Sequence, residues 1–150
     1  HSFGGSTAVL TGDKDNRVKA VSVIDGWMNP LPNELIQGGI DLPYLYMGRA
    51  SWIDSDYPSS PSLSEILHKN NTGPSYHILI KNTRHLNFCD APLFTPIGKY
   101  LVEIGDIDRK RSVDLVNQLS LEFFDKYLRQ KPSELLSKSI VIPEFIFSNK

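Results

Sequence analysis

The chain has 150 residues, of which 40% are hydrophobic and 22% charged, and its formal net charge is −1. This balance is typical of a folded globular domain with its own core and unlike that of a disordered chain. The small net charge gives no electrostatic basis for binding nucleic acid. No apolar run approaches the roughly 20 residues that span a bilayer, and a single cysteine, Cys89, excludes a disulfide within the chain.

The first half of the chain predicts one helix and two strands. Residues Gly4 to Leu10 are small or apolar and predict a short helix that ends near Gly12. The run Val18–Ile24 is rich in valine and isoleucine, which predicts a strand buried on both faces and followed by a turn. A second strand is predicted at Leu42–Gly48, where Pro43 stands near the start, a position that tolerates proline.

The second half of the chain alternates helices with one more strand. The pair Ser62 and Glu65 has the spacing of a capping box and predicts the start of a helix. The β-rich run Tyr76–Asn82 predicts a third strand. Two helices follow, at Thr95–Ile104 with proline at its first position and at Val113–Arg129 with an apolar stripe. The tail SIVIPEFIFSNK is apolar, is broken by a proline and receives no assignment.

Strands separated by helices predict an α/β fold with a mainly parallel sheet, in which catalytic loops follow the strand ends. Asp25 directly follows the first predicted strand, and His85 lies three residues beyond the third. Ser2 precedes the small residues Gly4 and Gly5, which give a tight strand-to-helix turn the space it needs. The chain order Ser, Asp, His is that of α/β-hydrolases, where a G-x-S-x-G turn lifts the serine above the sheet.

Each of these residues also has an ordinary structural explanation. Ser2 would serve equally as the N-cap of the helix that follows, and Asp25 as a turn residue before glycine. Asp54 and Asp56 lie in the loop after the second predicted strand. They are rival acids, because many α/β-hydrolases place the catalytic acid in that loop. Three other histidines compete with His85: His1 on the serine's own turn, His68 on a helix and His77 inside a strand. Taken together, and at strand ends, the three candidates favour a hydrolase.

Three segments, HSFGGSTAV, VIDGWMNPL and RHLNFCDAP, resemble the platelet-activating factor acetylhydrolase family in its plasma and type II forms. The later stretch GDIDRKRSVDLVNQLSLEFFDKYL is similar to the closing helix of that family, so the resemblance runs from His1 to about Leu128. It implies that Asp25 rather than Asp54 is the acid. It also implies that residues 1–150 form a partial α/β-hydrolase domain, the C-terminal half of the family's catalytic domain, which begins at the nucleophile elbow. We expect such a chain to be inactive alone.

The resemblance implies a calcium-independent serine hydrolase that removes the sn-2 acetyl, or a short or oxidised acyl group, from phospholipids like platelet-activating factor. Ser2 would be the nucleophile, His85 the general base and Asp25 the group that orients the base. The Phe3 backbone N–H would supply half of the oxyanion hole, because the residue after the nucleophile provides one donor. No metal or cofactor is expected.

The remaining expectations concern what the chain contacts. Trp27, Leu86 and Phe88 are the candidate lining of the substrate pocket. The expected partner is a phospholipid, with contact to a lipid or lipoprotein surface as an additional possibility, and both a secreted and a cytoplasmic location agree with the sequence. Two other functions stay open: a non-catalytic module that keeps the hydrolase scaffold for binding, and an esterase for small soluble esters.

Overall fold

A four-stranded sheet forms the centre of the computed structural model, which describes residues 1–52, 59–94, 103–137 and 140–150. The strands follow the order β1 (Val21–Ile24), β2 (Tyr44–Arg49), β3 (Ser75–Ile80) and β4 (Phe145–Phe147). The first three are parallel, and β4 pairs antiparallel with β3. The prediction of a mainly parallel sheet is therefore confirmed.

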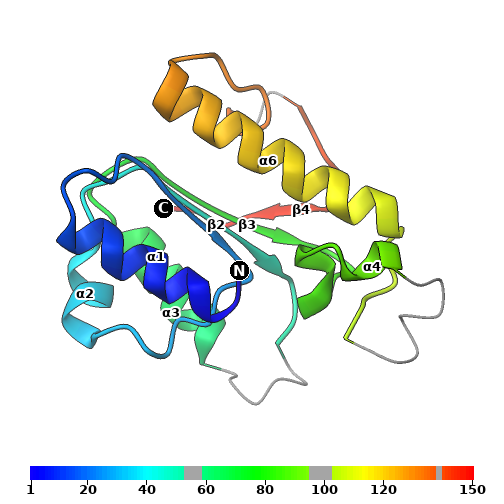
Figure 1. Ribbon diagram of the computed structural model, residues 1–150, viewed down its shortest axis with the longest axis horizontal. Coiled ribbons are helices and arrows are strands. Elements are labelled where there is room, and N and C mark those ends of the chain that lie inside the picture. Colours follow the sequence, from blue (N-terminus) through cyan, green and yellow to red (C-terminus); the bar gives the residue numbers. More distant parts are fainter. Residues whose placement is uncertain (53–58, 95–102, 138–139) are drawn as a thin grey trace.

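Helices cover both faces of the sheet (Figure 1). The long helix α6 (Arg109–Arg129) lies on one face, and α1 (Phe3–Lys14), α2 (Asn33–Gly38) and α3 (Ser60–Asn70) lie on the other. The alternation of side chains along β2 supplies both cores, because successive residues of a strand point to opposite faces. Leu45 and Met47 pack in the core that includes α6, whereas Tyr44 and Tyr46 pack in the core that includes α1 and α3.

Two short helical segments follow β3 at the end of the sheet where the site lies. The 3-10 helix η1 spans His85–Phe88, and α4 spans Ala91–Phe94. The long predicted helix Val113–Arg129 is confirmed as part of α6, and the three predicted strands appear as β1 to β3 with shifted ends. Most of the predicted helix Thr95–Ile104 lies outside the described residues.

The capping-box prediction at Ser62 and Glu65 is wrong. Helix α3 begins at Ser60, two residues earlier, so that both side chains lie inside the helix. Its N-cap is Ser59, which makes no side-chain capping hydrogen bond, and Pro61 occupies the first turn. Proline is favoured there because its fixed φ matches the helix and its missing N–H would have had no partner. Four elements, α2, η1, α4 and β4, have no counterpart in the predictions.

A buried polar network lies between β3 and α3. His77 is 3% exposed, its Nε2 lies 3.0 Å from Ser64 Oγ and its Nδ1 lies 2.8 Å from Ser148 Oγ. Its ring stacks on Tyr46 with the centroids 4.8 Å apart. Burial lowers the pKa of His77 to about 4, because the charged ring would lose its hydration. Burial also lowers the pKa of the neighbouring His68.

We expect the free energy of unfolding to fall as the pH drops from about 6.5 towards 4. The unfolded His77 takes up a proton near its ordinary pKa of 6.5, whereas the folded one does so only near 4, so acid favours the unfolded chain. Urea unfolding at pH 7.5 and pH 5 measures this, and in His77→Gln the drop should be smaller by about 2 kcal/mol. An equal drop in both proteins would contradict the assignment.

Candidate active site

Ser2 lies at a strained turn beside the end of β1. Its backbone has φ 56° and ψ −129°, a conformation that typically costs about 1–3 kcal/mol in a residue other than glycine. Its N–H donates to the Ile24 carbonyl at 3.2 Å, and its carbonyl accepts from the Trp27 N–H at 3.0 Å. Ser2 occupies the N-cap position of α1, but its hydroxyl makes no capping hydrogen bond. The Ser2 side chain is therefore not engaged in capping the helix.

Glycine is required where α1 approaches β1. A Cβ on Gly5 would lie 2.9 Å from the Gly26 Cα and 2.7 Å from Val23 Cγ1, which is closer than real Cβ atoms approach. A Cβ on Gly4 would meet nothing within 4 Å. The expectation that small residues make room for the turn is therefore confirmed at Gly5 and is wrong at Gly4.

The structure brings Ser2, Asp25 and His85 together. Asp25, at φ 42°, directly follows β1 and is fully buried, and His85 begins η1 just beyond β3. The Nδ1 atom of His85 lies 2.6 Å from Asp25 Oδ2, and its Nε2 lies 3.1 Å from Ser2 Oγ. Three side chains that are far apart in the sequence thus form one hydrogen-bonded series at the carboxyl ends of β1 and β3.

The competing histidines have other surroundings. His1 stacks on His85 with the ring centroids 4.5 Å apart, and its Nε2 donates to the His85 carbonyl at 3.2 Å. His68 and His77 are buried in the network between α3 and β3. The rival acids Asp54 and Asp56 lie outside the described residues.

The other predicted site residues are placed as follows. Phe3 is the first residue of α1, so its N–H has no carbonyl one turn earlier to bind, and its ring lies 5.8 Å from that of Trp27. Leu86 is half-buried, and its N–H donates to the Glu103 carbonyl at 2.9 Å. Phe88 is 4% exposed and belongs to the core beneath α6. The oxyanion role of Phe3 and the pocket roles of Trp27, Leu86 and Phe88 stay predictions.

Asn87, which the sequence analysis did not single out, holds the segment that carries His85. Its side chain is 1% exposed in the folded chain, and its Oδ1 accepts from the Arg84 N–H at 2.8 Å and from the Gly105 N–H at 2.7 Å. Its Nδ2 donates to Ser112 Oγ on α6 at 3.4 Å. A polar residue between the apolar Leu86 and Phe88 is the signal that would have pointed to such a role.

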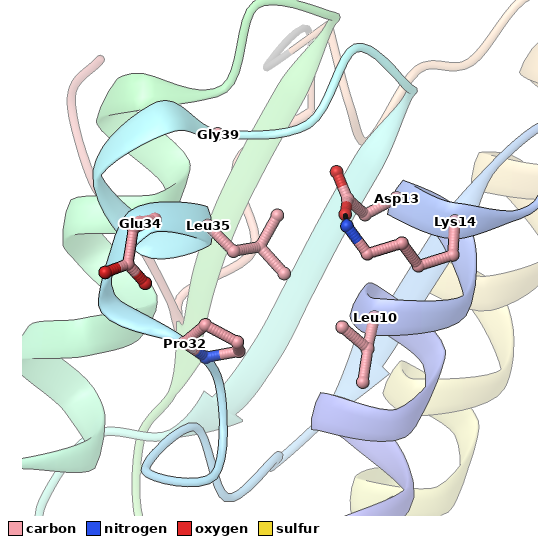
Figure 2. Close-up of a pocket in the computed structure, with 7 residues that line it drawn as sticks. All are labelled: Leu10, Asp13, Lys14, Pro32, Glu34, Leu35 and Gly39. Atoms are coloured by element: carbon pink, nitrogen blue, oxygen red, sulfur yellow. Dashed lines mark ion pairs between the residues drawn. The ribbon is translucent and has the colours of Figure 1, made fainter.

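Two cavities lie near these elements. One of 390 Å³ lies between α1 and α2, where Leu10 and Lys14 face Pro32 and Leu35 (Figure 2), and Ser2, Asp25 and His85 do not line it. Another of 170 Å³ is lined by Ile24, Phe88 and residues of α6 among others. Since Ile24 precedes Asp25 and Phe88 shares η1 with His85, the smaller cavity adjoins the elements that carry Asp25 and His85.

Comparison with known proteins first defines the class. A ferulic acid esterase from Streptomyces cinnamoneus superposes with a TM-score of 0.80 and 26% sequence identity, over 99% of this chain and 45% of that one. Together with the mainly parallel sheet and its flanking helices, this defines a partial α/β-hydrolase fold. Within the described residues, no helix has both the length and the apolar character needed to cross a membrane.

Sequence comparison then defines the family. The family model described as platelet-activating factor acetylhydrolase, isoform II, matches residues 1–135, and the chain belongs to this family. Platelet-activating factor acetylhydrolase of Cavia porcellus is 33% identical over 132 residues, and that of Gallus gallus is 29% identical over 133. These alignments cover 85% and 87% of this chain but only 29% and 31% of the relatives. The chain thus spans less than a third of their length.

We expect Asn87→Ala to lower the free energy of unfolding by about 1–3 kcal/mol, because two partly buried backbone N–H groups lose their acceptor and a fully buried unpaired group costs about 1–3 kcal/mol. Urea unfolding measures the change. The matched control is Asn29→Ala, whose exposed amide donates to Ser59 Oγ at 2.8 Å, and it should differ from the unsubstituted protein by less than about 1 kcal/mol. Equal effects of the two substitutions would contradict the role given to Asn87.

Proposed function

We propose that this chain carries the catalytic triad of a serine esterase, with Ser2 as nucleophile, His85 as general base and Asp25 as the orienting acid. The observation that carries the proposal is the continuous series of contacts, 3.1 Å from Ser2 Oγ to His85 Nε2 and 2.6 Å from His85 Nδ1 to Asp25 Oδ2. Membership in a family named for an acetylhydrolase supports the same chemistry.

The proposed reaction proceeds through an acyl-enzyme. Ser2 Oγ attacks the ester carbonyl while His85 Nε2 takes the serine proton, and the negative charge on the carbonyl oxygen is met by the Phe3 N–H. His85 then returns the proton to the departing alkoxide as the carbon–oxygen bond of the ester breaks. Water, deprotonated by His85, attacks the acyl group and releases the acid and Ser2. Asp25 holds the imidazole with Nδ1–H towards its own carboxylate throughout.

The proposed substrate is a phospholipid with an acetyl or another short or oxidised acyl group at the sn-2 position, like platelet-activating factor. The name of the family and of the related proteins supports this choice. Because the serine hydroxyl is the nucleophile, the reaction does not need calcium to activate a water molecule.

Contact with a lipid or lipoprotein surface is part of the proposal. On α4, directly after the segment that carries His85, Leu93 is 51% and Phe94 is 83% exposed. Large apolar side chains that are exposed in solution favour binding to a lipid interface, because they leave water when they enter it. The free energy gained is roughly proportional to the apolar area that is buried.

An esterase for small soluble esters is the second candidate, and the likeness to a ferulic acid esterase favours it. The same three side chains would act on either class of ester. The acyl and alcohol groups that the substrate pocket accepts therefore decide between the two candidates. A non-catalytic binding module would keep the fold without a reactive Ser2.

Although the sequence leads us to expect an inactive chain, we expect a fluorophosphonate to label Ser2 of the native protein, because His85 Nε2 lies 3.1 Å from Ser2 Oγ and the probe reacts with a serine that an adjacent base has activated. Peptide mass spectrometry locates the adduct. His85→Ala should abolish it, whereas Ser120→Ala, which removes a hydroxyl bonded to the Val116 carbonyl within α6, should leave it intact. A folded protein without an adduct on Ser2 would favour the non-catalytic module.

The two classes of ester are separated by comparing kcat/KM for an acetyl-ester phospholipid and for a feruloyl ester. Preference for the phospholipid supports the proposed substrate, and preference for the feruloyl ester supports the second candidate. Hydrolysis of both should fall by a factor on the order of 10³ or more in Ser2→Ala.

A further inference from the structure

The buried carboxylate of Asp25 has a second partner besides His85. Arg49, the last residue of β2, donates its backbone N–H to Asp25 Oδ1 at 2.9 Å. The Nε of the same arginine lies 3.2 Å from Asp25 Oδ2, the oxygen that faces His85, in an ion pair rather than a well-directed hydrogen bond. Each carboxylate oxygen is therefore contacted by Arg49, and one of them is shared with the histidine.

The guanidinium of Arg49 is itself fixed from two further directions. The side chain is 8% exposed, and its Nη1 donates to Glu103 Oε1 at 2.8 Å. Its Cζ lies 3.9 Å above the centre of the Trp52 ring, within the range of a cation–π contact. A planar cation held between two carboxylates and stacked on an aromatic ring has little freedom to turn, so Arg49 presents a fixed charge to Asp25.

Glu103 links this cation to the base. Its backbone carbonyl accepts from the N–H of Leu86, the residue after His85, at 2.9 Å. Arg49 thus contacts Asp25 directly. It also binds the side chain of Glu103, whose backbone carbonyl accepts the hydrogen bond from the segment that carries His85. Arg49 is therefore connected to both partners of the hydrogen bond between Asp25 and His85.

We propose that Arg49 is a positioning residue of the triad: it keeps the buried Asp25 carboxylate turned towards His85, and with Glu103 it fixes the segment that carries His85. This inference rests on the proposed function, in which Asp25 and His85 act together. Removing a buried cation leaves its carboxylate poorly compensated. The carboxylate is then free to turn away from His85, and the imidazolium formed during attack on the ester is less well stabilised.

The test is Arg49→Met in the native protein, which removes the charge and keeps most of the apolar stem. We expect kcat to fall about 10- to 100-fold, less than the factor on the order of 10⁴ for a displaced triad acid, with KM within about twofold. KM should not move, because a positioning residue acts on the rate through Asp25 and His85 and not on substrate binding. The rate of fluorophosphonate labelling at Ser2 should fall in parallel with kcat.

Three comparisons separate positioning from a general loss of stability. Arg111→Met is the matched control, because it breaks an arginine–glutamate pair of 2.8 Å with Glu144 away from the site, and it should leave kcat unchanged. Arg49→Lys retains a charge without the planar fork and should recover part of kcat. In proton NMR spectra, the downfield resonance of the hydrogen between His85 Nδ1 and Asp25 Oδ2 should shift or broaden in Arg49→Met and not in Arg111→Met.

Glu103→Ala provides a second variant in case Arg49→Met does not fold. The Glu103 side chain is 42% exposed, and the substitution keeps the backbone bond to Leu86. We expect Glu103→Ala to lower kcat less than Arg49→Met does and to leave KM unchanged. The double variant of Arg49→Met and Glu103→Ala should lose less kcat than the product of the two single losses, because both substitutions remove the same Arg49–Glu103 contact. An unchanged kcat in Glu103→Ala, or a wild-type labelling rate in Arg49→Met, would overturn the inference.

The experiment also separates failure of this inference from failure of the proposed function. If Ser2→Ala retains ester hydrolysis, or if Ser2 of the unsubstituted protein is not labelled, the triad itself is refuted. If Ser2 is labelled and needed for activity while Arg49→Met matches Arg111→Met in every measurement, only the role of Arg49 is refuted.

Discussion

The carboxylate of Asp25 is fully buried at the end of β1, and the geometry around it follows from the need to compensate that charge. Its partners come from different parts of the chain: Arg49 from the end of β2 and His85 from the segment after β3. Parallel pairing of β1 with β2, in which Ile24 lies opposite Met47, brings Asp25 and Arg49 together. A slip of one residue in that pairing would turn the side chains to the opposite faces of the sheet and leave the Asp25 carboxylate without Arg49 as a partner.

The serine is positioned by the same strand that carries the acid. Ser2 is bonded through its backbone to Ile24 and Trp27, the residues that bracket the Asp25–Gly26 corner. Both Ser2 and Asp25 adopt positive φ angles, each of which typically costs about 1–3 kcal/mol for such residues. The close approach of Gly5 to Gly26 allows α1 to pack against that corner and offset the strain. The positions of the proposed nucleophile and acid are therefore fixed relative to each other by backbone hydrogen bonds and by the packing of α1 against β1.

The sequence was informative where local pattern decides structure. Runs of β-branched, aromatic or other apolar residues located β1, β2 and β3, and the position of Asp25 and His85 just beyond strands predicted their meeting. Arg49 and Asn87 were missed because their contacts, to Asp25 and to Gly105, join distant segments and leave no periodic trace. The six residues of α2 and the three of β4 are too short for a periodic signal. Ser62 and Glu65 have the spacing of a capping box, but they lie inside α3. The helix begins earlier, at Ser60, where Pro61 in the first turn favours a helix start.

The tail that includes β4 lies along β3 at one edge of the sheet. Its Glu144 carbonyl accepts from the Lys81 N–H, its Ser148 hydroxyl reaches His77, and Lys150 donates to the carbonyls of Asn71 and Gly73. Because β4 occupies the edge of β3, a chain cut before Pro143 would leave a row of unpaired amides and carbonyls beside an apolar strand. Such an edge recruits strands from other molecules. The tail therefore covers this side of β3 as well as completing the core.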